Sequence, residues 1–341
     1  MLPGLSSAVE ASIRKALTSS VTASGAEYYE QVDYHLFGGR DEQAQAIGVQ
    51  LMSGPDLIVA VTDPERPVGD IRVQTGGTGN LLFLDNRAWQ GSLTASVRIL
   101  GNDCAVMFND IGRGGYVMLH DVFMRSHRQF LFWGRGSTAV GCNIELEGQD
   151  QGVVIGDDAL IANGVWIRNY NMHALHDLTT GEPIGRPPTT TVLERHVWLG
   201  QDALLLNCGR IGAGAVVGAR SLVTRPVPPC VIVAGSPAQV RREQVSWGRD
   251  TYRMTAAERN EMICDDGAAQ PVVTANDDLR VAFRVGTPHH HRQTQLVEPA
   301  HGILMHALPE QDQSVGCLHR CRRSALAGGE QHAVTRSSQL L

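Results

Sequence analysis

The chain has 341 residues, of which 43% are hydrophobic and 19% charged, a balance typical of a globular protein. Its formal net charge of -6 gives no indication of nucleic acid as a partner. No apolar stretch is long enough to span a membrane. Seven scattered cysteines and the lack of a visible secretory signal predict free thiols in a reducing, cytoplasmic environment.

Residues 1–67 are predicted to form an N-terminal α/β cap. A helical stretch covers Leu5–Thr18, mixed structure follows, and "TDPERPVGD" (62–70) has the composition of a linker. We assign this segment as a cap because a stack of repeats needs a different unit to cover its end.

A repeat domain is predicted over residues 68–243. In its first half, four segments place a polar or glycine pair before an apolar run that ends in a polar turn: "GNLLFLDN" (79–86), "GNDCAVMFND" (101–110), "GGYVMLHD" (114–121) and "RQFLFWGR" (128–135). Their register is loose, and we interpret them as degenerate coils of the stricter repeat that follows.

The stricter repeat has a period of six. An aliphatic residue recurs at Ile155, Ile161, Ile167, Leu193, Leu199, Leu205, Ile211, Val217 and Val223, and a small or branched residue follows eight of these nine four positions later. Helical burial repeats near every 3.6 residues, so this pattern does not fit a helix. It fits a short strand followed by a corner, in coils that stack and complete each other's hydrogen bonds. Short strands of a sandwich are the alternative, but irregular loops between them would break the register.

One excursion interrupts this rhythm. The stretch "RNYNMHALHDLTTGEPIGRPP" runs from Arg168 to Pro188 and carries two histidines and three prolines. Proline cannot donate to a strand ladder, so we expect a stiff loop that projects from the solenoid and can reach a neighbouring subunit.

Beyond the repeat, residues 244–284 are predicted to form an extension with a short helix at "TAAERNEMI" (255–263). Residues 285–341 have little periodicity and are predicted to be largely disordered. This tail contains "PHHHR" (288–292) and "CLHRC" (317–321). Neither has the paired spacing of a metal site, so no metal is predicted.

Two stretches of the repeat are similar to those of a known protein family, namely "IGDDALIANGVWIRN" (155–169) and "VWLGQDALLLNCGRIGAGAVVGARSLVTRPVPPCVIVAGSPAQVRRE" (197–243). Together with the loop between them, they resemble the hexapeptide-repeat acyltransferases, closest to O-acetyltransferases of capsular and other surface polysaccharides. The resemblance covers residues 152–243. It implies an all-β fold, the left-handed parallel β-helix, with homotrimers whose active sites lie in clefts between subunits. It also implies acetyl-CoA as donor and a sugar or polysaccharide hydroxyl as acceptor.

The loop motif "NMHALHD" is similar to the family's catalytic motif, which implies that His173 is the general base. A neutral imidazole, with an ordinary pKa of about 6.5, can take the proton of an attacking alcohol. Asp177 falls on the family's second position, where it could orient the ring or cap the turn at "DLTTGE".

Trp198 stands in "RHVWLG", on the coil directly after the excursion, and should face outward because Val197 and Leu199 bracket it. The resemblance implies that its indole N–H donates toward the acyl group, although subunit packing is an alternative role. His196 is interpreted either as structural or as a group that supports the catalytic residues without touching the substrate.

The resemblance also implies that the arm of acetyl-CoA lies along the later coils. Gly200, Gly218 and Ala219 are small enough for a close approach, and Arg225 stands where the family has a basic residue for phosphate.

Three other functions remain open at this stage. An N-acyltransferase for an amino sugar could use the same scaffold, since loops build the acceptor pocket. A β-helix metalloenzyme of the γ-carbonic anhydrase type would need three converging histidines. The candidates by number alone are His120, His127, His173, His176 and His196. A non-catalytic solenoid is the third, but stacking alone needs no histidine-bearing loop.

Overall fold

The computed structural model describes residues 5–18, 33–87, 91–109 and 116–249. All of them belong to one compact unit, Met1–Pro271. The predicted helix at 255–263, the tail at 285–341 and both of its histidine and cysteine clusters lie outside the described residues. Within the described ranges, no helix combines the length and the apolar character that crossing a membrane requires.

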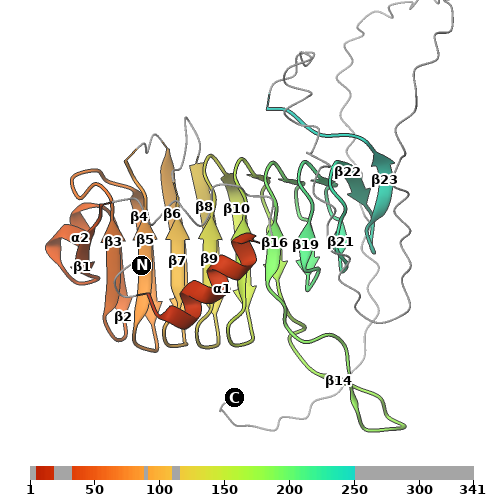
Figure 1. Ribbon diagram of the computed structural model, residues 1–341, viewed down its shortest axis with the longest axis horizontal. Coiled ribbons are helices and arrows are strands. Elements are labelled where there is room, and N and C mark those ends of the chain that lie inside the picture. Colours follow the sequence, from red (N-terminus) through yellow and green to blue (C-terminus); the bar gives the residue numbers. More distant parts are fainter. Residues whose placement is uncertain (1–4, 19–32, 88–90, 110–115, 250–341) are drawn as a thin grey trace, which may run out of the picture. The chain divides into compact units, whose positions relative to one another are not determined.

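Two ladders of strands, stacked coil upon coil, make up most of this unit (Figure 1). The first contains β1 (His35–Gly38), β3 (Leu57–Val61), β5 (Asn80–Leu84), β7 (Ala105–Phe108), β9 (Phe130–Trp133), β11 (Gly152–Ile155), β16 (Thr191–Leu193) and β19 (Arg210–Ile211). The second runs through β2 (Val49–Ser53), β4 (Gly69–Thr75), β6 (Ser92–Ile99), β8 (Tyr116–Met124), β10 (Thr138–Leu146), β12 (Leu160–Ile161), β17 (Trp198–Leu199), β20 (Val216–Val217), β22 (Val231–Ala234) and β23 (Gln239–Glu243). A third column of short strands, β13 (Val165–Arg168), β18 (Leu204–Leu206) and β21 (Leu222–Val223), branches from β10.

The pairing between coils is parallel, which confirms the predicted all-β solenoid. The exceptions are the two ends, where β1 pairs with β3 and β23 pairs with β22 in antiparallel fashion. Strands from successive coils therefore satisfy each other's backbone groups along the whole stack.

The period of six places the core residues as expected. All nine aliphatic residues of the repeat are at most 2% exposed. They stack in three columns, for example Ile155 on Leu193 and Leu193 on Ile211. One position differs, because at "NCG" the side chain of Cys208 fills the interior and Gly209, the expected small residue, is only half-buried.

The earlier coils are built differently from the degenerate hexapeptides that the sequence suggested. The nine-residue strand β10 pairs with β12 at one end and with β13 at the other. One long strand upstream thus corresponds to two consecutive short strands in each coil downstream. Register shifts in the β8–β10 and β6–β8 pairs mark the bend, so a β-bulge replaces the turn that separates two hexapeptides.

The upstream strands of the first ladder are buried on both faces, as in the fully buried run of β7. Their outer face is covered by α1 (Ser7–Thr18), the helix predicted near the N-terminus. Val9 and Ile13 of α1 pack there against Phe83 and Phe132. This covered face explains why these segments are continuous apolar runs without alternation.

The cap and the solenoid overlap in sequence. The short helix α2 (Glu42–Ala46) and β1 lie before the first coil, as a cap should. However, β2 and β3 already join the parallel ladders. The stack therefore begins at Val49, inside the 1–67 segment that we assigned to the cap.

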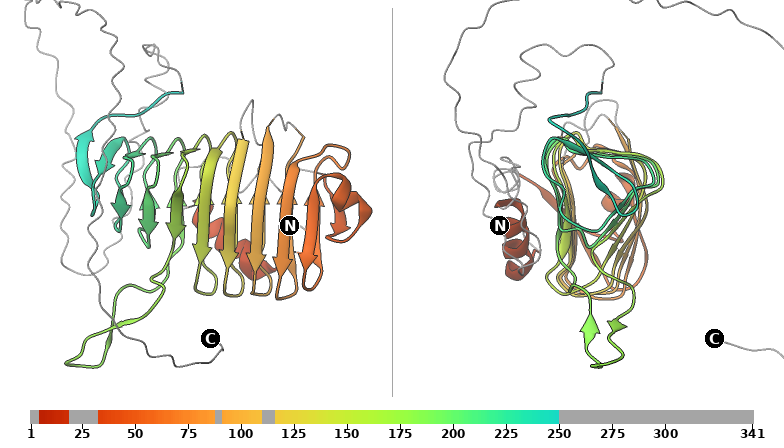
Figure 2. Two further views of the ribbon diagram at one scale, coloured as in Figure 1. Left: turned by 180° about the vertical axis from the view of Figure 1, so that it is seen from behind. Right: turned by 90° about the vertical axis from the view of Figure 1, so that its right-hand side faces the viewer.

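The excursion projects from the solenoid, as predicted, and it forms a hairpin. Its strands are β14 (Leu175–His176) and β15 (Pro183–Ile184), which pair only with each other. The hairpin leaves the solenoid between β13 and β16 and extends away from the coils in both views (Figures 1 and 2).

Candidate active site

The hairpin is fixed at its base on the side where it leaves the solenoid. The side-chain amide of Asn169 donates to the carbonyl oxygen of Glu147 at 2.9 Å, and the backbone N–H of Glu147 donates back to the Asn169 side chain at 2.9 Å. Asn169 is fully buried, so this reciprocal pair is shielded from water.

The returning side is fixed by a second asparagine. The amide of Asn207 donates to the carbonyl oxygens of Arg186 at 3.3 Å and Pro187 at 2.9 Å. The Arg186 guanidinium in turn donates to the carbonyl oxygen of Thr224, two coils further along. The base of the hairpin is therefore tied to three coils.

His173 lines a hollow of about 410 Å³ at the base of the hairpin. The other lining residues are Glu147, Tyr170, Asn171, Ala174, Pro183, Ile184, Gly185, Arg186, Pro187 and Pro188. The imidazole is exposed and has no hydrogen-bond partner among the described residues. Its nitrogen lone pair is thus available to a molecule that enters the hollow.

Asp177 performs the second of the two roles considered from the sequence. Its carboxylate accepts hydrogen bonds from the backbone N–H groups of Thr179 at 2.7 Å and Thr180 at 3.1 Å. These bonds hold the pKa of Asp177 below its usual value. The side chain therefore closes the hairpin turn, and no contact joins it to His173.

Trp198 faces outward from β17, as predicted, and its side chain is 38% exposed. Its indole N–H has no hydrogen-bond partner among the described residues. Among the described residues, no hydrogen bond or ring contact joins Trp198 to His173, and Trp198 does not line the hollow. Within one protomer, the two predicted catalytic groups thus do not share this hollow.

The one described aromatic neighbour of Trp198 is Trp247, whose ring lies 6.1 Å away at an angle of 54°. Trp247 belongs to the C-terminal strap, residues 245–249, which folds back over a column of coil corners. The strap contacts the successive corner residues Cys230, Gly214, His196 and Asp158. These corners all have positive φ, between 52° and 68°.

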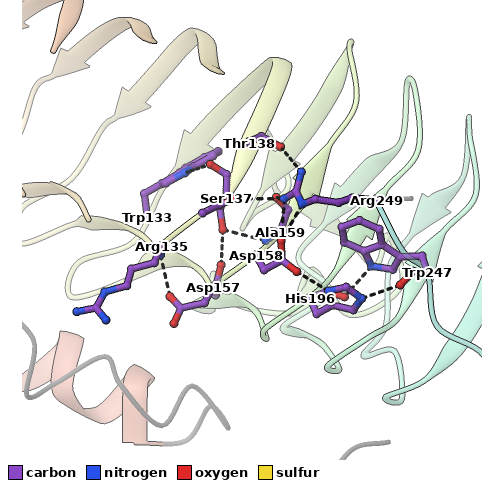
Figure 3. A network of polar contacts seen from close by, with 12 residues as sticks. Trp133, Arg135, Ser137, Thr138, Asp157, Asp158, Ala159, His196, Trp247 and Arg249 are labelled. Carbon is purple, nitrogen blue, oxygen red and sulfur yellow. Dashed lines mark hydrogen bonds and ion pairs between the residues drawn. The ribbon is translucent and has the colours of Figure 1, made fainter. Parts of the chain in front are cut away.

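The side chain of His196 is fixed by contacts at both ring nitrogens and at one face of the ring, which agrees with a structural role (Figure 3). Its ring stacks on Trp247 with centroids 4.2 Å apart and planes 3° apart. Nδ1 lies 2.6 Å from the Asp158 carboxylate, and Nε2 lies 2.8 Å from the Trp247 carbonyl oxygen. Both ring nitrogens of His196 therefore face oxygen atoms of the protein, a carboxylate on one side and a backbone carbonyl on the other.

Asp158 is the anion of this network. Burial raises the pKa of its carboxyl group, but hydrogen bonds from His196 and Arg249 outweigh that effect, so the pKa lies below the usual value. The Arg249 guanidinium donates to Asp158 at 2.9 Å and to the carbonyl oxygen of Gly136 at 3.1 Å, as Figure 3 illustrates for Asp158.

The residues expected to contact acetyl-CoA lie on neighbouring coils. A side chain on Gly200 would meet the backbone of Ala219 at 2.6 Å, so the close stacking of coils alone accounts for this glycine. Gly218 is half-buried, whereas Ala219 and Arg225 are exposed. The described residues give Arg225 no ion-pair partner.

The histidines counted as possible zinc ligands do not converge. The described part of the chain contains no group of three or more histidine, cysteine, aspartate or glutamate side chains that could hold a metal ion. Sequence reasoning also missed Trp247, Asp158 and Arg249. The only signal was a lone tryptophan in the polar segment "SWGRD" after the last coil.

No protein-family model matches the chain, but its sequence is similar to those of curated O-acetyltransferases. It is 28% identical over 151 residues to the Escherichia coli (strain K12) protein named "Putative lipopolysaccharide biosynthesis O-acetyl transferase WbbJ", which is 41% of this chain and 72% of that protein. It is 37% identical over 95 residues to the galactoside O-acetyltransferase of the same organism, 28% of this chain and 45% of that protein.

A solved structure, the polySia specific acetyltransferase NeuO, matches with 23% identity and a TM-score of 0.44 over 55% of this chain and 93% of that one. A TM-score of this size supports no further conclusion. The chain spans most of the first curated relative but less than half of the second. In sequence the chain is thus similar to acetyltransferases, and its fold is a parallel β-solenoid.

Proposed function

We propose that the protein transfers the acetyl group of acetyl-CoA to a sugar hydroxyl of a polysaccharide or another glycan. The observation that carries this proposal is the hollow beside His173, at the base of a hairpin that is anchored on both sides. The two curated relatives support the acceptor class, since one is named for galactoside and the other for lipopolysaccharide biosynthesis.

In the proposed reaction, His173 accepts the proton of the sugar hydroxyl as its oxygen attacks the thioester carbonyl. The tetrahedral intermediate then expels the CoA thiolate, which takes the proton back from the imidazolium. The products are the acetyl ester and free CoA. General base help of this kind accelerates reactions by roughly 10²–10⁴-fold.

The negative charge that develops on the carbonyl oxygen needs a hydrogen-bond donor. The unpaired indole N–H of Trp198 suits this role, and such donors contribute about 10²–10³-fold to turnover. The arm of acetyl-CoA would pass Gly200, Gly218 and Ala219, and the exposed guanidinium of Arg225 would meet a phosphate group.

The site is completed by a second copy of the chain, in a closed homotrimer. In one protomer Trp198 does not line the hollow beside His173, so in this proposal a second copy supplies one of the two groups. The hairpin also exposes four large apolar side chains: Met172 at 50%, Leu175 at 57%, Leu178 at 99% and Ile184 at 52%. Exposed apolar groups gathered on a projecting element are typical of an interface.

Turnover of labelled acetyl-CoA with a panel of neutral, acidic and amino sugars tests the proposal. We expect an alkali-labile ester product, and almost none with His173→Ala. His176→Ala is the matched control, since His176 is also exposed on the hairpin but does not line the hollow. Full activity in His173→Ala would remove this base, and an amide as the sole product would indicate N-acetylation.

A further inference from the structure

We propose that Trp247, which lies in the C-terminal strap, is a positioning residue that fixes the orientation of the Trp198 indole. The inference rests on the proposed function insofar as it gives Trp198 a role in acetyl transfer. The physical contact between the two tryptophans is independent of that function.

Among the described residues, Trp198 has no side-chain hydrogen bond and no ring contact except that with Trp247. Its side chain projects from β17 into solvent on a two-residue strand, and its indole N–H is unpaired among the described residues. A half-exposed indole without a hydrogen bond can occupy several rotamers. A donor to a transition state must instead be held in place beforehand, because its value depends on preorganisation.

The side chain of Trp247 is itself held in a fixed position. Its side chain is only 6% exposed and stacks on the His196 ring. Its indole N–H donates to the His196 carbonyl oxygen at 2.8 Å, while the His196 ring donates to the Trp247 carbonyl oxygen at 2.8 Å. Because its N–H is occupied, Trp247 cannot serve the substrate itself.

His196, which anchors Trp247, is close in sequence to Trp198, which Trp247 contacts. His196 precedes Trp198 by two residues, at the corner that leads into β17. The reciprocal hydrogen bonds therefore tie the strap to the same corner that presents Trp198. Arg249 extends this attachment to the two preceding corners through Asp158 and Gly136.

The test compares Trp247→Ala, which removes the ring beside Trp198, with Trp247→Phe, which keeps an aromatic ring. Ser246→Ala is the control, since this strap residue contacts the Gly214 carbonyl oxygen and not Trp198. We expect Trp247→Ala to lower kcat about tenfold and to change KM for acetyl-CoA less than about twofold. Trp247→Phe should recover most of the loss, and Ser246→Ala should match the unaltered protein.

A double variant separates positioning from a general effect on folding. If Trp247 acts through Trp198, Trp247→Ala should cause no further loss of kcat in a Trp198→Ala background. A second tenfold loss there would overturn the inference, as would an unchanged kcat in the single variant.

A measurement without substrate keeps this inference distinct from the proposed function. In protein labelled with 5-fluorotryptophan, the ¹⁹F resonance of residue 198, assigned with Trp198→Phe, should shift and broaden in Trp247→Ala. An unchanged resonance would refute the contact between the rings. A changed resonance in a protein that transfers no acetyl group would uphold the positioning and reject the acetyltransferase function.

Discussion

His173 and His196 belong to the same solenoid but stand in opposite surroundings. His196 has an acceptor at each ring nitrogen and a tryptophan against its face. His173 is exposed beside a hollow and has no described partner. A histidine with both ring nitrogens bound to oxygen atoms of the same chain is committed to holding structure. One that keeps a free lone pair at a rigid site can move a proton.

The two regions also differ in how they are attached to the coils. The hairpin is tied only at its base, by buried asparagines, and its far end is open to a partner. The strap is tied at every corner that it crosses. The first arrangement presents a group to another molecule, whereas the second fixes groups of the same chain.

The largest expected effect is the loss of catalysis in His173→Ala. We predict that kcat falls by about 10³-fold, within the range for a general base, with no change in thermal unfolding because the side chain makes no described contact. Steady-state kinetics and calorimetry on this variant and on His176→Ala would check it. A similar loss in both variants would point to the hairpin as a whole.

His196→Ala should show the reverse pattern. It removes two hydrogen bonds and a ring stack and leaves the Asp158 carboxylate with Arg249 alone. We expect a loss of about 2–3 kcal/mol in the free energy of unfolding, measured with urea. The fall in kcat should be far smaller than in His173→Ala. Unchanged stability would mean that the strap does not hold this corner.

Asn207→Ala tests the anchor of the hairpin. Its side chain is almost fully buried and holds two carbonyl oxygens of the returning segment. We expect a loss of about 1–2 kcal/mol in stability and a higher KM for the acceptor. Wild-type KM values together with the lower stability would show that the shape of the hollow does not depend on this anchor.

Acid should release the strap only at low pH. Because the pKa of Asp158 is lower in the folded than in the unfolded protein, its contribution to stability is present above the unfolded value, about pH 4, and is lost as pH falls through the folded value. The fluorescence of Trp247, taken as the difference from Trp247→Phe, should stay constant from pH 6 to about 4.5. Release between pH 6 and 5 would contradict this assignment.

Sequence alone was sufficient for the features that depend on local periodicity. The period of six identified all nine interior aliphatic residues, and the break in that period identified the hairpin. Each inner position is dictated by its own coil, so a repeat in the chain translates directly into a repeat in space.

Features that depend on contacts between distant segments could not be predicted. The stack of His196 on Trp247 joins residues from a corner and from beyond the last coil, and neither has a local pattern. The long strands upstream were not predicted either, because a β-bulge in β8 and β10 stands where a turn separates two short strands downstream. Asp177 illustrates the same difficulty, since a motif cannot distinguish a turn cap from a partner of His173.

The central claim is that the base and the indole donor of one active site come from different copies of the chain. Mixing His173→Ala with Trp198→Ala protein, under conditions in which subunits exchange, tests it directly. Random assembly of equal amounts leaves about a quarter of the sites with both native groups, so we predict recovery of about a quarter of wild-type activity. No recovery, with exchange verified by native mass spectrometry, would contradict the claim.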